Sequence, residues 1–134
     1  MNQLEPNKAT VARYVEAFNR GDLEKLKTLF APDAIVHGVL GWGGMDKVLP
    51  IWCELHEAFG IALTIEAMIA EGDCVAVRYT ERGTFRAAFR GHPPTGKSYE
   101  LGAMEWFVLK DGLIQKRWGA RDSASQARQL EMKL

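Results

Sequence analysis

The last strand-like segment of the chain carries an aromatic residue and a carboxylate four positions apart, in Trp118-Gly-Ala-Arg-Asp122. Side chains of a strand alternate between its two faces. One face of a strand over residues 113–122 is therefore expected to carry Ile114, Lys116, Trp118, Ala120 and Asp122. An apolar wall raises the pKa of a carboxyl group by desolvation, which suits the group to proton transfer near neutral pH. The pattern predicts Asp122 as the acid/base of a small-molecule pocket. The structural alternative is that Trp118 is core and Asp122 is a strand-end cap.

Two further side chains are candidates for the same pocket. His37 ends a short expected strand beside a Gly-rich loop, and histidine titrates near physiological pH. It is a second candidate acid or base, or else a strand-end residue bonded to backbone. Glu105 lies in an otherwise apolar strand, where a buried carboxylate needs a partner. It either faces the pocket or pairs across strands with one of the arginines Arg78, Arg82 and Arg117.

Composition limits the classes of protein to consider. A length of 134 residues suits one domain, residues 1–134. The 17 basic residues equal the 17 acidic ones, so no charge excess predicts a nucleic-acid or membrane partner. Two cysteines are too few for a disulfide framework, and the first residues lack a signal-peptide pattern. For these two reasons a cytoplasmic setting is expected. Histidines and cysteines lack metal-ligand spacing and no phosphate loop is present, so neither metal nor cofactor is expected.

Hydrophobic periodicity predicts helices first and strands after them. Three helices are expected. The first covers residues 7–20, the second is short and follows the N-cap residue Asp22, and the third covers residues 45–59. Because Pro50 falls inside the third, the sequence does not decide where its regular part begins. Strands are expected over residues 34–37, 62–70, 74–89, 98–109 and 113–122. Residues 123–134 are expected to form a polar tail, in which one short helix is an open alternative. This order indicates an α+β fold, a cone-shaped roll in which three N-terminal helices pack on a curved, mostly antiparallel sheet.

Four phrases of the sequence resemble the SnoaL-like polyketide cyclase group of the nuclear transport factor 2-like superfamily. They are residues 14–22 (YVEAFNRGD), 29–37 (LFAPDAIVH), 89–97 (FRGHPPTGK), and Asp111-Gly-Leu-Ile with the Trp118-x-x-x-Asp122 ending. The resemblance implies a cofactor-free ring closure by intramolecular aldol addition on an aromatic polyketide ester, with Asp122 as acid/base. One departure is that Phe85 follows Gly83-Thr84, where the family often carries a histidine.

Two other functions stay open. One is a non-catalytic module that binds an apolar ligand in the same cone. The other is an epoxide-hydrolase-like enzyme, which the neighbouring residues Arg121 and Asp122 suggest. Adjacent residues of a strand face opposite ways, so Arg121 is expected to point away from the face of Asp122.

Three expectations follow for the structure and for experiment. Asp122→Asn is expected to abolish turnover and leave the fold intact. Apolar residues on both faces of the strand at 98–109 predict a homodimer through the sheet. A small apolar or aromatic ligand is expected in a pocket lined by Phe18, Trp42, Trp52, Phe59, Phe85, Glu105, Trp106 and Trp118.

Overall fold

The computed structural model describes residues 4–132 as four helices and one six-stranded sheet. The helices are α1 (Leu4–Arg20), α2 (Leu23–Thr28), α3 (Met45–Phe59) and α4 (Ser123–Leu130). The strands are β1 (Phe30–Gly38), β2 (Gly41–Gly43), β3 (Ala62–Glu71), β4 (Cys74–Thr84), β5 (Ser98–Lys110) and β6 (Leu113–Arg121).

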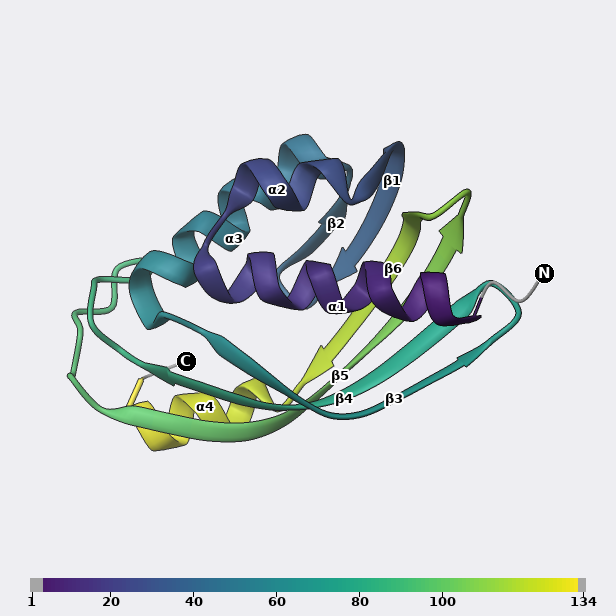
Figure 1. The fold of residues 1–134 in the computed structure, drawn as a ribbon. Helices are drawn as coiled ribbons and strands as arrows, with labels where there is room; N and C mark the ends of the chain where they lie inside the picture. The colour runs from purple at the N-terminus through teal and green to yellow at the C-terminus, as the bar shows by residue number, and fades with distance from the viewer. Residues whose placement is uncertain (1–3, 133–134) are drawn as a thin grey trace.

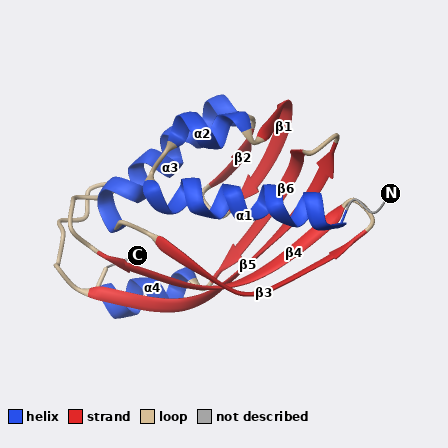
Figure 2. Cartoon of the chain, viewed as in Figure 1, coloured by secondary structure: helices blue, strands red, loops and turns tan. Residues whose placement is uncertain are grey.

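The sheet is curved and open, with strand order β2-β1-β6-β5-β4-β3. All neighbours are antiparallel except β1 and β6, which run parallel. Helices α1, α2 and α3 lie on its concave side, and α4 lies beside the end of β5 (Figures 1 and 2). The predicted α+β roll is confirmed.

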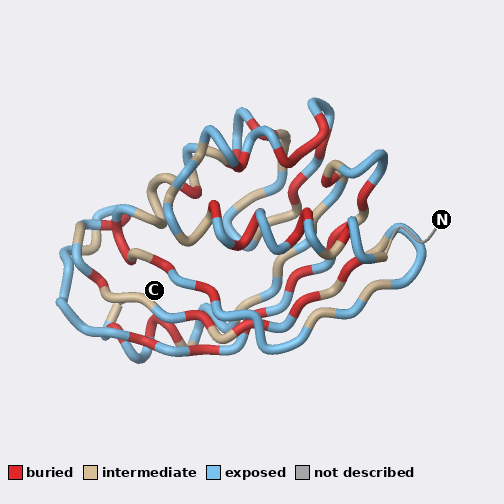
Figure 3. The backbone as a smooth tube through the Cα atoms, viewed as in Figure 1, coloured by how far each residue is buried: buried red, intermediate tan, exposed pale blue. Residues whose placement is uncertain are grey.

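The core forms between α1 and the concave face of the sheet. Buried and exposed residues alternate along β5, so one face of that strand is interior throughout (Figure 3). Helix α1 contributes Val11, Tyr14 and Val15, whose three- and four-residue spacing places them on one side of a helix.

Helix α3 is continuous from Met45, with Pro50 in its second turn. It ends at Gly60, whose backbone is left-handed with φ 55°.

Several elements differ from the predictions. β1 begins at Phe30 and not at Ala34, and residues 41–43, expected in a Gly-rich loop, form β2. The long strand expected over residues 74–89 ends at Thr84, after which Phe85 bonds to the backbone of Gly96 and Lys97. The short segment around Phe89 forms only an isolated bridge with His92. The tail forms the one short helix that the sequence left open, α4, but it is not polar throughout, because its Leu130 is fully buried in the core.

A register shift in β6 decides which residues face the interior. The β5–β6 pairing is irregular between Val108 and Leu109, and Ile114 and Arg117, three residues apart, both point inward. An extra residue in one strand reverses the alternation beyond it. The expectation that Trp118, Ala120 and Asp122 share the face of Ile114 is therefore wrong. The interior face carries Arg117, Gly119 and Arg121 instead.

Among the described residues, no helix has the length and apolar character needed to cross a membrane.

Candidate functional site

A narrow cavity lies between the concave face of the sheet, α3 and the turn that joins β1 to β2. Its volume is about 70 Å³, room for a few water molecules. The apolar part of its wall includes Phe18, Val36, Leu40, Val48, Ile51, Trp52, Leu55, Ile61 and Leu63. Its polar side chains all come from the sheet: Tyr79, Glu81, Glu105, Arg117 and Arg121.

Small residues keep the floor of the cavity open. Ala103 of β5 and Gly119 of β6 both line it. Gly119 pairs with Glu105 in the strand ladder, and Ala103 pairs with Arg121. The floor therefore lies between two carboxylate–arginine pairs, Glu105 with Arg117 and Glu81 with Arg121. The two glutamates are on the neighbouring strands β5 and β4.

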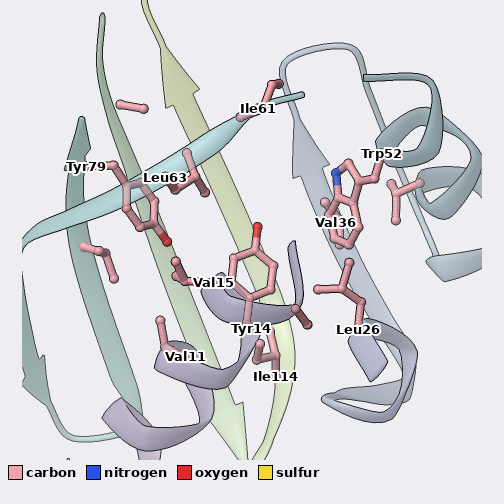
Figure 4. Close-up of a cluster of buried hydrophobic side chains, with 14 of the residues drawn as sticks. Val11, Tyr14, Val15, Leu26, Val36, Trp52, Ile61, Leu63, Tyr79 and Ile114 are labelled. Carbon is pink, nitrogen blue, oxygen red and sulfur yellow. The ribbon is translucent and has the colours of Figure 1, made fainter. Parts of the chain in front are cut away.

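The first pair joins Glu105 to Arg117 and to two tyrosines. Glu105 accepts hydrogen bonds from the hydroxyl of Tyr14 at 3.1 Å, from that of Tyr79 at 2.7 Å and from Nη2 of Arg117. Figure 4 shows Tyr14 rising from α1 and Tyr79 from the sheet, with both hydroxyl groups in the interior. Glu105 is 7% exposed. Two tyrosine hydroxyls and the Arg117 guanidinium therefore satisfy this buried carboxylate.

Arg117 has donor groups that the protein leaves unused. Its Nε is buried, and no acceptor for it lies among the described residues. Its guanidinium also lies over the ring of Trp52, 5.6 Å from the ring centre. A buried donor without an acceptor is costly. Arg117 therefore lines the cavity with one buried donor that the described residues leave without an acceptor.

The second pair joins Glu81 to Arg121. Glu81 accepts from the Tyr99 hydroxyl at 2.6 Å, from Arg121 Nε at 3.0 Å and from Arg121 Nη2. Arg121 Nη1 donates to Gln126 of α4 at 3.1 Å. Burial opposes the charge of Arg121, but the hydrogen bonds and attraction to Glu81 outweigh it and raise the pKa of Arg121. More of the donors of Arg121 are engaged than of Arg117.

All three tyrosines of the chain belong to these two sets. Burial raises the pKa of Tyr14, Tyr79 and Tyr99, and the charge of Glu81 adds to the effect at Tyr99. They stay neutral and donate hydrogen bonds. Over residues 4–132, no three histidine, cysteine, aspartate or glutamate side chains gather closely enough to hold a metal ion.

Comparison with known proteins identifies the family. The model of the SnoaL-like polyketide cyclase family matches residues 8–130. The chain belongs to this family. No curated protein matches the sequence.

Solved structures agree with this assignment. IdmH, a proposed polyketide cyclase from Streptomyces antibioticus, is 32% identical with a TM-score of 0.84, over 93% of this chain and 98% of that one. A proposed polyketide cyclase from Silicibacter sp. TM1040 is 27% identical with a TM-score of 0.84, over 93% and 95%. A SnoaL-like protein from Jannaschia sp. CCS1, 19% identical over 100% and 97%, shares the fold with a TM-score of 0.89. Membership of the family supports a cyclase-like or related enzyme, on the cone fold of the nuclear transport factor 2-like superfamily.

Asp122 does not lie on the cavity wall, so its expected location is wrong. It is exposed and caps α4, accepting a hydrogen bond from the backbone N–H of Ser125 at 3.0 Å. Arg121 points the opposite way, into the cavity. The catalytic role of Asp122 stays a prediction, and its position favours the structural alternative.

His37 also points away from the cavity. Its ring stacks on Trp118 with centres 4.9 Å apart and meets the edge of Trp42 at 4.5 Å. Its partner in the ladder is Trp118, which is on the outer face of the sheet. His37 follows the buried, cavity-lining Val36 on β1, so the alternation along that strand turns it to the outer face.

The predicted aromatic wall is mostly wrong. Phe18 and Trp52 line the cavity, and so does Glu105. Trp42, Trp106 and Trp118 are 65%, 49% and 38% exposed. Phe59 and Phe85 pack on each other in the core, with ring centres 5.1 Å apart.

Sequence reasoning missed Tyr79 and Glu81, considered Arg121 only beside Asp122 in the epoxide-hydrolase alternative, and found Arg117 only as a possible partner of Glu105. A signal was present: polar residues repeat at two-residue spacing, as Tyr79 and Glu81 in one strand and as Arg117 and Arg121 about Gly119 in another. Such spacing places them on one face of each strand. The position of the register shift is needed to know which face that is.

Proposed function

We propose that this protein is a cofactor-independent cyclase or isomerase that acts at Glu105 and Arg117. The observation that carries the proposal is a buried carboxylate on the cavity wall beside an arginine whose buried Nε has no acceptor. Such a pair supplies a proton acceptor and a cation for a developing oxyanion, in surroundings from which water is largely excluded.

The proposed reaction begins with a proton between two carbonyl groups of the substrate. Glu105 takes this proton, and the electron pair moves onto a carbonyl oxygen held by Arg117. The enolate carbon then attacks a ketone or aldehyde carbon of the same molecule, and one carbon–carbon bond forms. The new alkoxide takes the proton back from Glu105, so the carboxylate is regenerated and no oxidant or reductant is consumed.

The surroundings of Glu105 suit an acidic carbon acid. Its two oxygens already accept hydrogen bonds from Tyr14, Tyr79 and Arg117, so a substrate proton that is easily removed suits it. A carbon between two carbonyls needs only a weak base, since both carbonyls stabilise the enolate. This argument favours a polyketide-type substrate, the class that the description of IdmH as a proposed polyketide cyclase also suggests.

Access to the cavity requires movement of its rim. A drug-sized ligand needs roughly 300 Å³ or more, whereas the cavity has about 70 Å³. The turn at Gly38-Val39-Leu40-Gly41 lines the cavity from outside the sheet. We expect this turn to open when an aromatic ring enters.

Glu105→Gln tests the proposal, with Glu100→Gln as its matched control. Both glutamates are on β5, but Glu100 is exposed and pairs with Arg82 on the outer face. Ring closure of aromatic polyketide esters that carry a ketone or aldehyde is followed by absorbance and by liquid chromatography, which separates the substrate from its isomeric product. For a substrate that the wild type converts, we expect Glu105→Gln to lower turnover about 10²–10⁴-fold and Glu100→Gln to leave it unchanged.

Two results would contradict the proposal. Full turnover by a folded Glu105→Gln variant would remove Glu105 from the chemistry. Tight binding of these esters by the wild type, without conversion of any, would favour the alternative of a non-catalytic binding module.

We further propose that two copies of the chain pair through the outer face of the sheet. That face carries a groove with Arg78 in its lining and otherwise mostly apolar residues, which include Ala67, Ile69, Ala76, Met104, Trp106, Trp118 and Ala120. Ile69, Met104 and Trp106 are 69%, 59% and 49% exposed, and an apolar patch of this kind marks an interface. A second copy supplies a matching apolar surface by symmetry.

A further inference from the structure

Gly119 is the point where the side chains of Glu105 and Arg117 meet. It lines the cavity floor, and Glu105 is directly opposite it in the β5–β6 ladder. Side chains of directly opposite residues are neighbours on the same face of a sheet. Arg117 precedes Gly119 by two residues on the same strand, so its side chain rises from that face as well.

The guanidinium of Arg117 occupies the space that a side chain at position 119 would fill. A Cβ atom built on Gly119 would lie 3.0 Å from both Nη1 and Nη2 of Arg117 and 3.1 Å from its Cζ. These distances are tighter than ordinary carbon contacts, so the guanidinium would have to move by a few tenths of an ångström. The backbone itself does not require glycine, because Gly119 is in a regular strand and is not among the residues with positive φ.

We infer that Gly119 is a positioning residue, which lets the guanidinium of Arg117 lie flat on the sheet, where it reaches Glu105 at the wall of the cavity. The inference rests on the proposed function for its catalytic consequence. Because a misplacement of about 1 Å in an active site costs roughly 100-fold in rate, a shift of a few tenths should cost several-fold to about tenfold.

The chain offers a matched control in Gly102. It is also in the interior of a strand without positive φ, but it is exposed, and a Cβ atom there would meet nothing within 4 Å. Gly119→Ala and Gly102→Ala therefore make the same chemical change with and without Arg117 in the way. Alanine is the easier residue in a strand, so neither change should lower thermal stability.

The first measurement follows Arg117 itself and needs no substrate. The Nε–H signal of Arg117 in a nitrogen–proton correlation spectrum is assigned from its loss in Arg117→Lys. We expect this signal to move in Gly119→Ala and to stay in place in Gly102→Ala. An unmoved signal in a folded Gly119→Ala variant would overturn the inference.

The second measurement uses 4-nitrophenol, whose coloured anion imitates an enolate and reports its own ionisation. We expect Gly119→Ala to bind the anion about tenfold more weakly than Gly102→Ala, in line with the rate estimate above. In an Arg117→Lys background, where the slimmer ammonium group leaves room for a Cβ atom, adding Gly119→Ala should change the affinity little. An equal loss in both backgrounds would overturn the inference.

The two proposals fail in different ways. If the Arg117 signal moves but neither anion binding nor turnover changes, then Arg117 has no part in the reaction and the proposed function fails. If Gly119→Ala does not fold, the Arg117→Lys/Gly119→Ala protein decides: folding of this protein places the clash at the guanidinium, and its failure to fold overturns the inference.

Discussion

At the scale of residues, the cavity is defined by two buried ion pairs with tyrosine donors. A buried carboxylate–arginine pair is costly to desolvate and contributes little net stability unless further hydrogen bonds satisfy it. Here Tyr14 and Tyr79 complete the shell of Glu105, and Tyr99 completes that of Glu81. Arg117 is the member with an unsatisfied buried donor, which is why we place the chemistry at its end of the cavity.

Two substitutions of Asp122 distinguish a helix-capping role of this residue from a catalytic one. Asp122→Ala removes the acceptor for the Ser125 N–H and should lower the free energy of unfolding by about 1 kcal/mol. Asp122→Asn retains a capping side chain, and it should keep both stability and turnover. Denaturant unfolding and the ester assay measure the two effects. Loss of turnover by a fully folded Asp122→Asn protein would instead identify Asp122 as the acid/base.

The raised pKa values of the three tyrosines predict how the protein responds to alkaline pH. Because the folded-state pKa of Tyr14, Tyr79 and Tyr99 is raised, their neutral forms stabilise the fold. This contribution is complete below the unfolded pKa of about 10 and is lost as pH rises toward the higher folded-state pKa values. We expect tyrosinate absorbance to rise only together with unfolding. A reversible titration of folded protein near the ordinary tyrosine pKa would contradict this prediction.

At the scale of elements, β6 and α4 have the largest effect on the site. The register shift in β6 turns Arg117, Gly119 and Arg121 inward. Helix α4 follows at once, and its Gln126 accepts a hydrogen bond from Arg121. The C-terminal helix is therefore part of the support of the second ion pair.

Removal of the apolar anchor of α4 tests its place in the core. Leu130 is fully buried, so Leu130→Ala should lower the free energy of unfolding by about 2–5 kcal/mol. Arg128→Ala, at an exposed position of the same helix, should change it by less than about 0.5 kcal/mol. Chemical denaturation of both variants compares them. Equal small effects would mean that α4 is not docked as the structure has it.

At the scale of the whole molecule, the two faces of the sheet have different tasks. The concave face holds the core and the cavity, and the outer face presents the mostly apolar groove around Trp106. A cone of this kind can bind a ligand inside while a second copy covers its outside. The two proposals can therefore be tested independently.

A charged residue in the groove should prevent pairing. We expect light scattering of the wild type at micromolar concentration to give twice the chain mass of 15.0 kDa. Trp106→Lys should give the monomer mass, because it places a charge in the apolar patch. Ala12→Lys, on the exposed side of α1, should leave the dimer intact. A monomeric wild type would refute the interface.

The sequence by itself determined most of the elements and their order. The spacing of Val11, Tyr14 and Val15 indicated α1, Gly60 marked the end of α3, and the Asp111-Gly112 turn marked the hairpin of β5 and β6. These features depend on local periodicity and on backbone freedom, which neighbouring residues specify. The buried partner of Glu105 was also within reach, because a carboxylate in an apolar strand must be paired.

Only the tertiary structure decided which side chains meet in the cavity. One irregular position in β6 exchanged the faces of the strand, so Trp118 went outward and Arg117 inward, and Asp122 became a helix cap. Alternation predicts which residues share a face, but not where an extra residue interrupts it, because that depends on pairing with β1 and β5. The site at Glu105 and Arg117 is therefore a product of strand register, which contacts between distant segments set.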